Sequence, residues 1–179
     1  MRVVAGSARG VPLTAPRDRA TRPITDRVKE TLFAILGDRV PGARVLDLYA
    51  GSGAIGIEAL SRGAVSADFV ERGREALAVL RANLERTRLT AHATIHAIDA
   101  GRLLSATDGP WDLVIADPPY DARDIVAPLR AAAGRLEPRG MLVLKHYWRA
   151  EPPALPGLAE TRQRRFGETM LTFMEATDA

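Results

Sequence analysis

The sequence has no cysteine among its 179 residues, which excludes disulfide scaffolds, thiolate zinc sites, iron–sulfur clusters and cysteine nucleophiles. It has no run of about 18 apolar residues, so we expect no transmembrane helix. Its first residues lack the apolar segment of a secretion signal, and the expected location is therefore cytoplasmic. Lysine is also scarce, because Lys29 and Lys145 are the only two and arginine carries the rest of the basic charge.

Hydrophobic residues make up 46% of the chain and charged residues 26%, as is typical of a globular protein with a packed core. The net charge of +3 is unevenly distributed, because residues 1–29 hold seven basic and two acidic side chains. A basic arm on a mildly acidic body favours a polyanionic partner. The alternative is a solvated surface in a chain that prefers arginine.

Two parts are expected along the chain. Residues 1–40 should form a small basic extension, a hairpin followed by a helix that Thr25 or Asp26 caps. Residues 41–179 alternate apolar strands with amphipathic helices, which predicts an α/β, Rossmann-like, doubly wound and mostly parallel sheet with a C-terminal antiparallel hairpin. The expected strands are 2–5, 11–14, 44–48, 67–70, 94–98, 113–116, 141–144, 159–166 and 169–175, and the expected helices after residue 40 are 54–61, 74–86 and 125–136.

A glycine-rich loop follows the strand at 44–48. Gly51, Gly53 and Gly56 match the spacing of a cofactor loop between a strand and a helix. Asp47 ends the strand, where its charge would oppose a pyrophosphate at the helix N-terminus but would attract a cation. S-adenosylmethionine (AdoMet), which carries a sulfonium and no phosphate, therefore suits the loop better than a dinucleotide.

Two more acids end the next strands. Glu71 matches the acidic residue that hydrogen-bonds ribose hydroxyls, and Asp99 follows the third core strand, within reach of an adenine amino group. With Asp47 they predict a pocket for a cationic nucleoside. The alternative is that Asp47 and Asp99 are turn or helix-capping residues.

The fourth core strand runs into Asp117-Pro118-Pro119-Tyr120. An exocyclic amino group on a nucleobase is a poor nucleophile, and two acceptors on its hydrogens would aim its lone pair at a methyl donor. Asp117 and the Pro118 carbonyl are the expected acceptors, the two prolines stiffen the turn, and Tyr120 offers a ring for stacking an extruded base. No metal is expected. The alternative is a turn that simply ends the strand.

Residues 47–53 (Asp-Leu-Tyr-Ala-Gly-Ser-Gly) and 117–120 resemble two motifs of class I AdoMet-dependent amino-methyltransferases. Residues 21–33 and 56–64 are similar to signatures of the RsmD family, bacterial 16S rRNA guanine-N2 methyltransferases of the guanine-966 type. The resemblance runs from about Arg2 to the final hairpin, which is nearly the whole chain.

The resemblance implies methyl transfer to one guanine of 16S rRNA on an assembling 30S subunit, by a monomer. Two departures from the family pattern are expected to affect the rim of the RNA site and not the chemistry. Lys145 stands at a strand end where relatives often carry Glu, and segment 148–157 is compressed and rich in proline. The implied AdoMet contacts are Asp47, Tyr49, Ala50, Gly51, Gly53, Glu71 and Asp99, the implied catalytic residues are Asp117, Pro118, Pro119 and Tyr120, and the implied RNA contacts are Arg2, Arg9, Arg22 and Arg27.

Four alternatives are weighed against this interpretation. A DNA adenine-N6 methyltransferase could use the same motif, but about 40 residues outside the core leave no room for a target-recognition region. A glutamine methyltransferase typically has Asn in place of Asp117. An intact acidic pocket argues against a non-enzymatic rRNA-binding assembly factor, and Asp47 argues against a nicotinamide enzyme.

Overall fold

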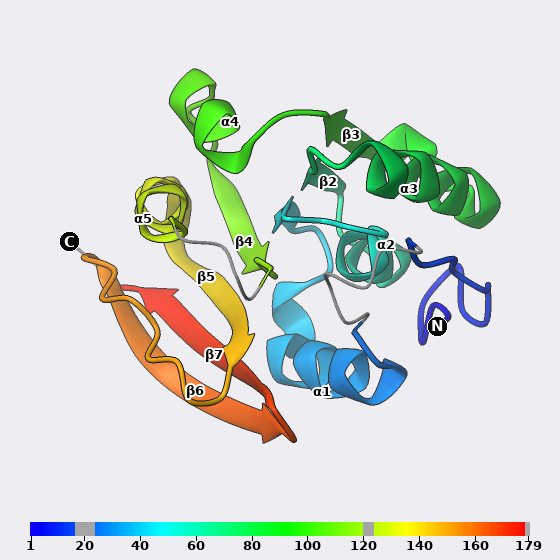
Figure 1. Ribbon diagram of the computed structural model, residues 1–179. Helices are drawn as coiled ribbons and strands as arrows, with labels where there is room; N and C mark the ends of the chain where they lie inside the picture. Colours follow the sequence, from blue (N-terminus) through cyan, green and yellow to red (C-terminus); the bar gives the residue numbers. More distant parts are fainter. Residues whose placement is uncertain (17–23, 120–123, 178–179) are drawn as a thin grey trace.

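The computed structural model describes residues 1–16, 24–119 and 124–177. Its centre is a seven-stranded sheet of order β3-β2-β1-β4-β5-β7-β6 (Figure 1). The first five strands are parallel, and β7 is antiparallel to both β5 and β6, which confirms the predicted doubly wound sheet with a terminal hairpin. The strands are β1 (Arg44–Leu48), β2 (Ser66–Val70), β3 (Ala93–His96), β4 (Trp111–Ala116), β5 (Leu136–Tyr147), β6 (Leu158–Phe166) and β7 (Thr169–Ala176).

Helices cover both faces of the sheet (Figure 1). Those on one face pack on Val45, Ile115 and Val143, and those on the other pack on the alternate residues of the same strands, such as Leu46 and Val114. Burial on both faces explains why these strands read as continuous apolar runs. The first face carries α1 (Asp26–Leu36), α2 (Ala54–Ser61) and α3 (Arg74–Thr87), the second carries α4 (Ala100–Ala106) and α5 (Val126–Ala133), and two short 3₁₀ turns are η1 (Gly37–Arg39) and η2 (Thr90–His92).

Most predicted elements are confirmed in kind, and several differ in extent. Strand β5 was predicted as 141–144 but runs over Leu136–Tyr147. The N-terminal hairpin pairs through a single bridge, Arg2 to Pro12, and has no strands of the predicted length. Helix α4 was not predicted. Helix α5 ends at Ala133 rather than at 136, because Gly134 caps it and β5 begins two residues later. Strand β3 ends at His96, two residues early.

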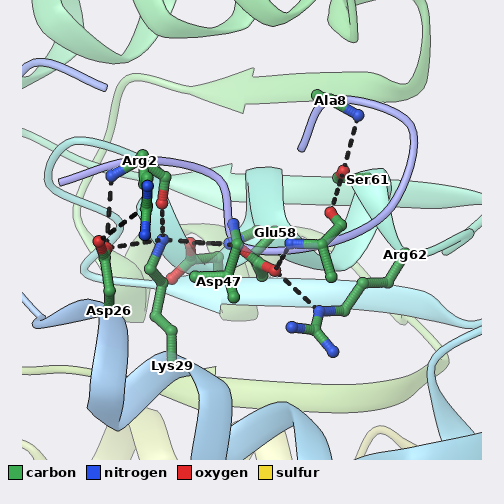
Figure 2. A network of polar contacts seen from close by, with 11 residues as sticks. Arg2, Ala8, Asp26, Lys29, Asp47, Glu58, Ser61 and Arg62 are labelled. Carbon is green, nitrogen blue, oxygen red and sulfur yellow. Dashed lines mark hydrogen bonds and ion pairs between the residues drawn. The ribbon is translucent and has the colours of Figure 1, made fainter. Parts of the chain in front are cut away.

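The N-terminal hairpin is held on α2 by a buried polar network (Figure 2). The Glu58 carboxylate, fully buried, accepts hydrogen bonds from the backbone N–H groups of Val4 at 2.8 Å and Ala5 at 3.0 Å. It also pairs with Arg62 Nε at 2.8 Å and with Lys29 Nζ at 3.4 Å. Lys29, counted above as part of the basic arm, is therefore a buried counter-ion rather than a surface charge.

Asn83 links the hairpin to the glycine loop. Its Nδ2 donates to the backbone oxygens of Thr14 and Ser52, each at 2.9 Å, and its Oδ1 accepts from the Thr14 N–H at 2.9 Å. Buried amides are usually satisfied in this way. Residues 1–16 thus share hydrogen bonds and a hydrophobic core with the sheet and its helices. Across the described ranges, no helix is long and apolar enough to cross a membrane.

Candidate functional site

A cavity of about 1030 Å³ opens at the carboxyl ends of the parallel strands. It lies where the strand order reverses between β1 and β4, which is the usual binding site in a doubly wound sheet. Its volume is at the upper end of small-molecule sites. Of the residues predicted to bind a cofactor or act in catalysis, those that line it are Asp47, Tyr49, Ala50, Gly51, Glu71, Asp99, Asp117 and Pro119.

The glycine loop turns sharply above β1. Tyr49 has φ of 63°, Gly51 has φ of 55° and Gly53 has φ of 76°, so the chain passes three times through the left-handed region before α2 begins. Gly53 lies beneath the loop, where a Cβ would stand 2.2 Å from Leu80 Cδ1. Tyr49, Ala50 and Gly51 thus face the cavity, whereas Gly53 allows the close packing of the loop on α3.

Asp47 is the most deeply buried acid of the cavity, with 1% of its surface exposed. Its Oδ2 accepts a hydrogen bond of 2.9 Å from the Gly56 N–H in the first turn of α2. Burial raises the pKa of Asp47 to about 7, and the nearby charges of Asp117 and Glu71 act in the same direction. A cation in the cavity would stabilise the charged form, so this carboxylate suits a positively charged ligand.

Glu71 and Asp99 each have a structural role as well as a place on the cavity. The Glu71 carboxylate accepts from the N–H groups of Gly51 at 2.8 Å and Gly73 at 2.6 Å, which ties the glycine loop to the turn after β2. Asp99 caps α4 by accepting from the Gly101 N–H at 2.9 Å. A carboxylate offers about four acceptor positions, so these bonds leave capacity for a ligand's hydroxyl or amino groups.

Asp117 follows β4 and lies beside Lys145 of β5, whose Nζ is 2.6 Å from Asp117 Oδ1. Burial raises the pKa of Asp117, and the Lys145 charge and hydrogen bond oppose that rise. Lys145 therefore sits against the predicted catalytic carboxylate, and the expectation that it affects only the rim of the site was wrong. Pro118 is buried, and Tyr120 lies outside the described residues.

The predicted RNA contacts that the structure describes do not line the cavity. Arg2, Arg9 and Arg27 are exposed, and Arg2 pairs with Asp26 at 3.6 Å; Arg22 lies outside the described residues. Pro16 and Ile24 both line the cavity. Sequence reasoning missed these two residues.

An aromatic and cationic cluster at the end of β5 was also missed. The Arg165 guanidinium lies 3.6 Å from the centroid of the Trp148 ring, and that of Arg149 lies 4.7 Å from it. The strand pairing brings the end of β6 next to the end of β5. Both ends lie on the side of the sheet where the parallel strands have their carboxyl ends, which is also where Asp117 lies. No local sequence pattern predicts this cluster, because Trp148 and Arg165 are distant in sequence and come together only when β6 and β7 pair beside β5.

A family model described as "Conserved hypothetical protein 95" matches residues 1–175. The chain belongs to this RsmD/YlbH family. It is 39% identical over 175 residues to the "Putative rRNA methyltransferase YlbH" of Bacillus subtilis, covering 94% of this chain and 95% of that one. It is 39% identical over 120 residues to the "Ribosomal RNA small subunit methyltransferase D" of Escherichia coli, covering 67% of this chain and 60% of that protein.

A solved structure of a similar protein has the same architecture. The "Putative methyltransferase yhhF from Escherichia coli" superposes with a TM-score of 0.87 and 30% identity, covering 98% of this chain and 97% of that one. The strand order 3-2-1-4-5-7-6 with an antiparallel β7 is that of class I methyltransferases. The fold resemblance inferred from the motifs is thereby confirmed.

Proposed function

We propose that this member of the RsmD/YlbH family transfers a methyl group from AdoMet to the exocyclic N2 of one guanine in 16S rRNA, on an assembling 30S subunit. The observation that carries the proposal is the pair of acids at the ends of neighbouring strands, Asp47 on β1 and Asp117 after β4, which open into one cavity. Two rRNA methyltransferases among the relatives support the choice of substrate.

The residues of the cavity suit AdoMet. Bound AdoMet supplies an electrophilic methyl group on a sulfonium, together with a cationic amino group, a ribose and an adenine. Asp47 is placed to balance the positive charge, Glu71 to accept from ribose hydroxyls, and Asp99 to accept from the adenine amino group. The φ above zero at Gly51 brings the backbone, without a Cβ, to the surface of the cavity.

The residues of the Asp-Pro-Pro-Tyr motif would bind and orient the target base. Asp117 and the Pro118 carbonyl accept hydrogens from the amino group, so that its nitrogen presents its lone pair to the methyl carbon. Tyr120, the next residue of the motif, would supply a ring on which the extruded base stacks. The reaction needs only orientation and electrostatics from these groups, and a proton leaves the nitrogen once the methyl group has been transferred.

AdoMet binding should depend on pH through Asp47. Its pKa of about 7 means that the carboxylate is largely protonated at pH 6, and AdoMet must displace that proton. The affinity should therefore rise by up to about tenfold for each pH unit below 7 and level off above it. Calorimetry between pH 5.5 and 7.5, in steps of about half a unit, measures this slope.

The matched variants for this prediction are Asp47→Asn and Asp99→Asn. The first should weaken binding at pH 7.5 and abolish the slope, whereas the second, at an exposed cap, should leave the slope unchanged. A slope that survives in Asp47→Asn would mean that another group of the cavity titrates.

Charge reversal in the basic arm should weaken RNA binding. Pro16 and Ile24 line the cavity at either end of the arginine-rich segment, and Arg27 is exposed on α1. The double variant Arg22→Glu and Arg27→Glu should raise the KM for rRNA about tenfold. It should also make the plot of log affinity against log salt concentration less steep, by the amount expected for the loss of about two phosphate contacts. Arg44→Glu, exposed at the opposite end of β1, is the control. An unchanged KM would show that the arm has no part in RNA binding.

The experiment that tests the proposed function is tritium transfer from labelled AdoMet to small-subunit RNA. The substrates are naked 16S rRNA and 30S particles from cells that lack the modification, each with wild-type protein and with Asp117→Ala. Incorporation that requires Asp117 is the expected result. No incorporation into either substrate, with AdoMet still bound, would contradict the proposed substrate.

A further inference from the structure

Lys145 and Asp117 are neighbours across two parallel strands. Ala116 on β4 pairs with Leu144 on β5, so the residues that follow them, Asp117 just after β4 and Lys145 within β5, lie side by side. Both project to the face on which Asp47 lies, because Ile115 and Val143 before them belong to the core of that face. The contact is therefore built into the register of the sheet and does not depend on a loop.

The surroundings of Lys145 leave it well shielded from water. Its residue is 5% exposed, and its cross-strand neighbour on β7 is Leu171, which is 1% exposed. Taking an ammonium group out of water is costly unless a counter-charge lies close by. Asp117 Oδ1, at 2.6 Å, supplies that counter-charge within the candidate site.

The charges around Asp117 oppose one another. Asp47 lies nearby on β1, and Lys145 faces Asp117 from β5. Glu71, directly after β2, and Asp124, just before α5, line the same cavity. Burial favours the protonated form of Asp117, whereas the charge and the hydrogen bond of Lys145 favour the charged form. A protonated Asp117 would be a poor acceptor for the hydrogens of an amino group.

We propose that Lys145 is a positioning residue for methyl transfer: it keeps the Asp117 carboxylate charged and fixes its Oδ1, so that Oδ2 accepts from the amino group of the target base. This inference rests on the proposed function. Each of the two buried carboxylates then has its own counter-ion. Lys145 neutralises the charge of Asp117 at all times, whereas the charge of Asp47 is neutralised only when the cationic cofactor is bound.

The proton balance follows from this arrangement. The amino nitrogen gives its lone pair to the methyl carbon, the carbon–sulfur bond breaks with its electrons on sulfur, and the nitrogen then loses one proton. The proton passes through Asp117 Oδ2 to water, and Lys145 favours its release because it opposes the rise in the Asp117 pKa that burial causes. The carboxylate is thus ready for the next base.

The first test measures Asp117 directly, without any substrate. Protein labelled with ¹³C at the aspartate carboxyl carbons is titrated by NMR, and Asp117→Asn identifies the Asp117 signal. In Lys145→Met, Asp117 should titrate about one to three pH units higher than in the wild type, whereas Lys145→Arg should leave it within about half a unit. If Lys145→Met does not fold, Lys145→Gln replaces it. An unchanged Asp117 titration would overturn the proposal.

The second test measures the pH profile of kcat for methyl transfer, with AdoMet affinity measured alongside. Lys145→Met should move the acidic limb of the profile upward and lower kcat at pH 7 about tenfold, and Lys145→Arg should restore both. AdoMet affinity should stay within about threefold, because Lys145 acts through Asp117. A loss of kcat that is equal at all pH values, with no shift of the acidic limb, would overturn the proposal that Lys145 keeps Asp117 charged.

The two tests separate this inference from the proposed function. A wild-type protein that methylates no rRNA but shows the NMR shift would refute the proposed substrate while supporting the effect of Lys145 on Asp117. A wild-type protein that is active on rRNA but shows no shift in Lys145→Met would refute only the inference.

Discussion

Asp117→Ala should lower kcat for methyl transfer about a thousand-fold while leaving the Kd for AdoMet within a few-fold of the wild type. Asp117 is assigned to the base, and the loss of one preorganised group in a buried site typically costs a factor of that size. Asp47 and Asp117 line the same cavity, so either could bind the cofactor. A fall in kcat without a fall in AdoMet affinity would therefore show that Asp117 acts on the base. Calorimetry and a single-turnover assay measure the two quantities.

Asp124→Ala is the control for this prediction, because Asp124 is an exposed acid on the same cavity. The kcat of Asp124→Ala should stay within about threefold of the wild-type value, because Asp124 is not assigned to the base and its removal changes only the overall charge of the cavity. Asp117→Ala also removes a counter-charge from Lys145, so its folding is checked by circular dichroism. An equal loss of AdoMet binding and of rate would show that Asp117 is a cofactor ligand.

Glu58→Ala should lower the free energy of unfolding by about 3–5 kcal/mol. The substitution removes a buried counter-charge from the Lys29 ammonium, which keeps Asp26 at 3.8 Å, and leaves the N–H groups of Val4 and Ala5 without their acceptor. A domain is typically stable by only about 5–15 kcal/mol, so the loss is a large share. Urea unfolding measures it.

Two further variants identify the cause of that loss. Glu85→Ala, at an exposed position on α3, should change stability by less than about 0.5 kcal/mol. Combining Glu58→Leu with Lys29→Met removes both charges and should be less destabilising than the sum of the single changes. Additive losses would mean that the two charges do not stabilise each other.

Local patterns were enough to predict the central part of the site. Strand β1, the glycine loop and α2 are contiguous in sequence, and the predicted bounds of β1 and α2 match the structure. Asp47 was predicted from its place near the carboxyl end of β1, and Asp117 from its place directly after β4. A parallel sheet necessarily brings such ends together on one side. Helix α4 was missed because seven residues, Ala100–Ala106, are too few to show a helical period.

Pairings between distant residues could not be read from the sequence. Lys29 pairs with Glu58, and Lys145 pairs with Asp117, each across nearly thirty residues. A lysine in a basic segment or at a strand end is usually exposed, so each of the chain's two lysines was assigned to the surface. Register explains the second pair afterwards, because the residues after Ala116 and Leu144 must meet once β4 and β5 pair.

The identity of the methylated nucleoside tests the central claim most directly. Wild-type protein and Asp117→Ala are incubated with AdoMet and three substrates: naked 16S rRNA, 30S particles that lack the modification, and duplex DNA. The products are digested and identified by mass spectrometry. The account predicts N2-methylguanosine in 16S rRNA or 30S particles, formed by the wild type alone. N6-methyladenine in the DNA, with unmodified rRNA, would contradict it and assign the same active site to a different substrate.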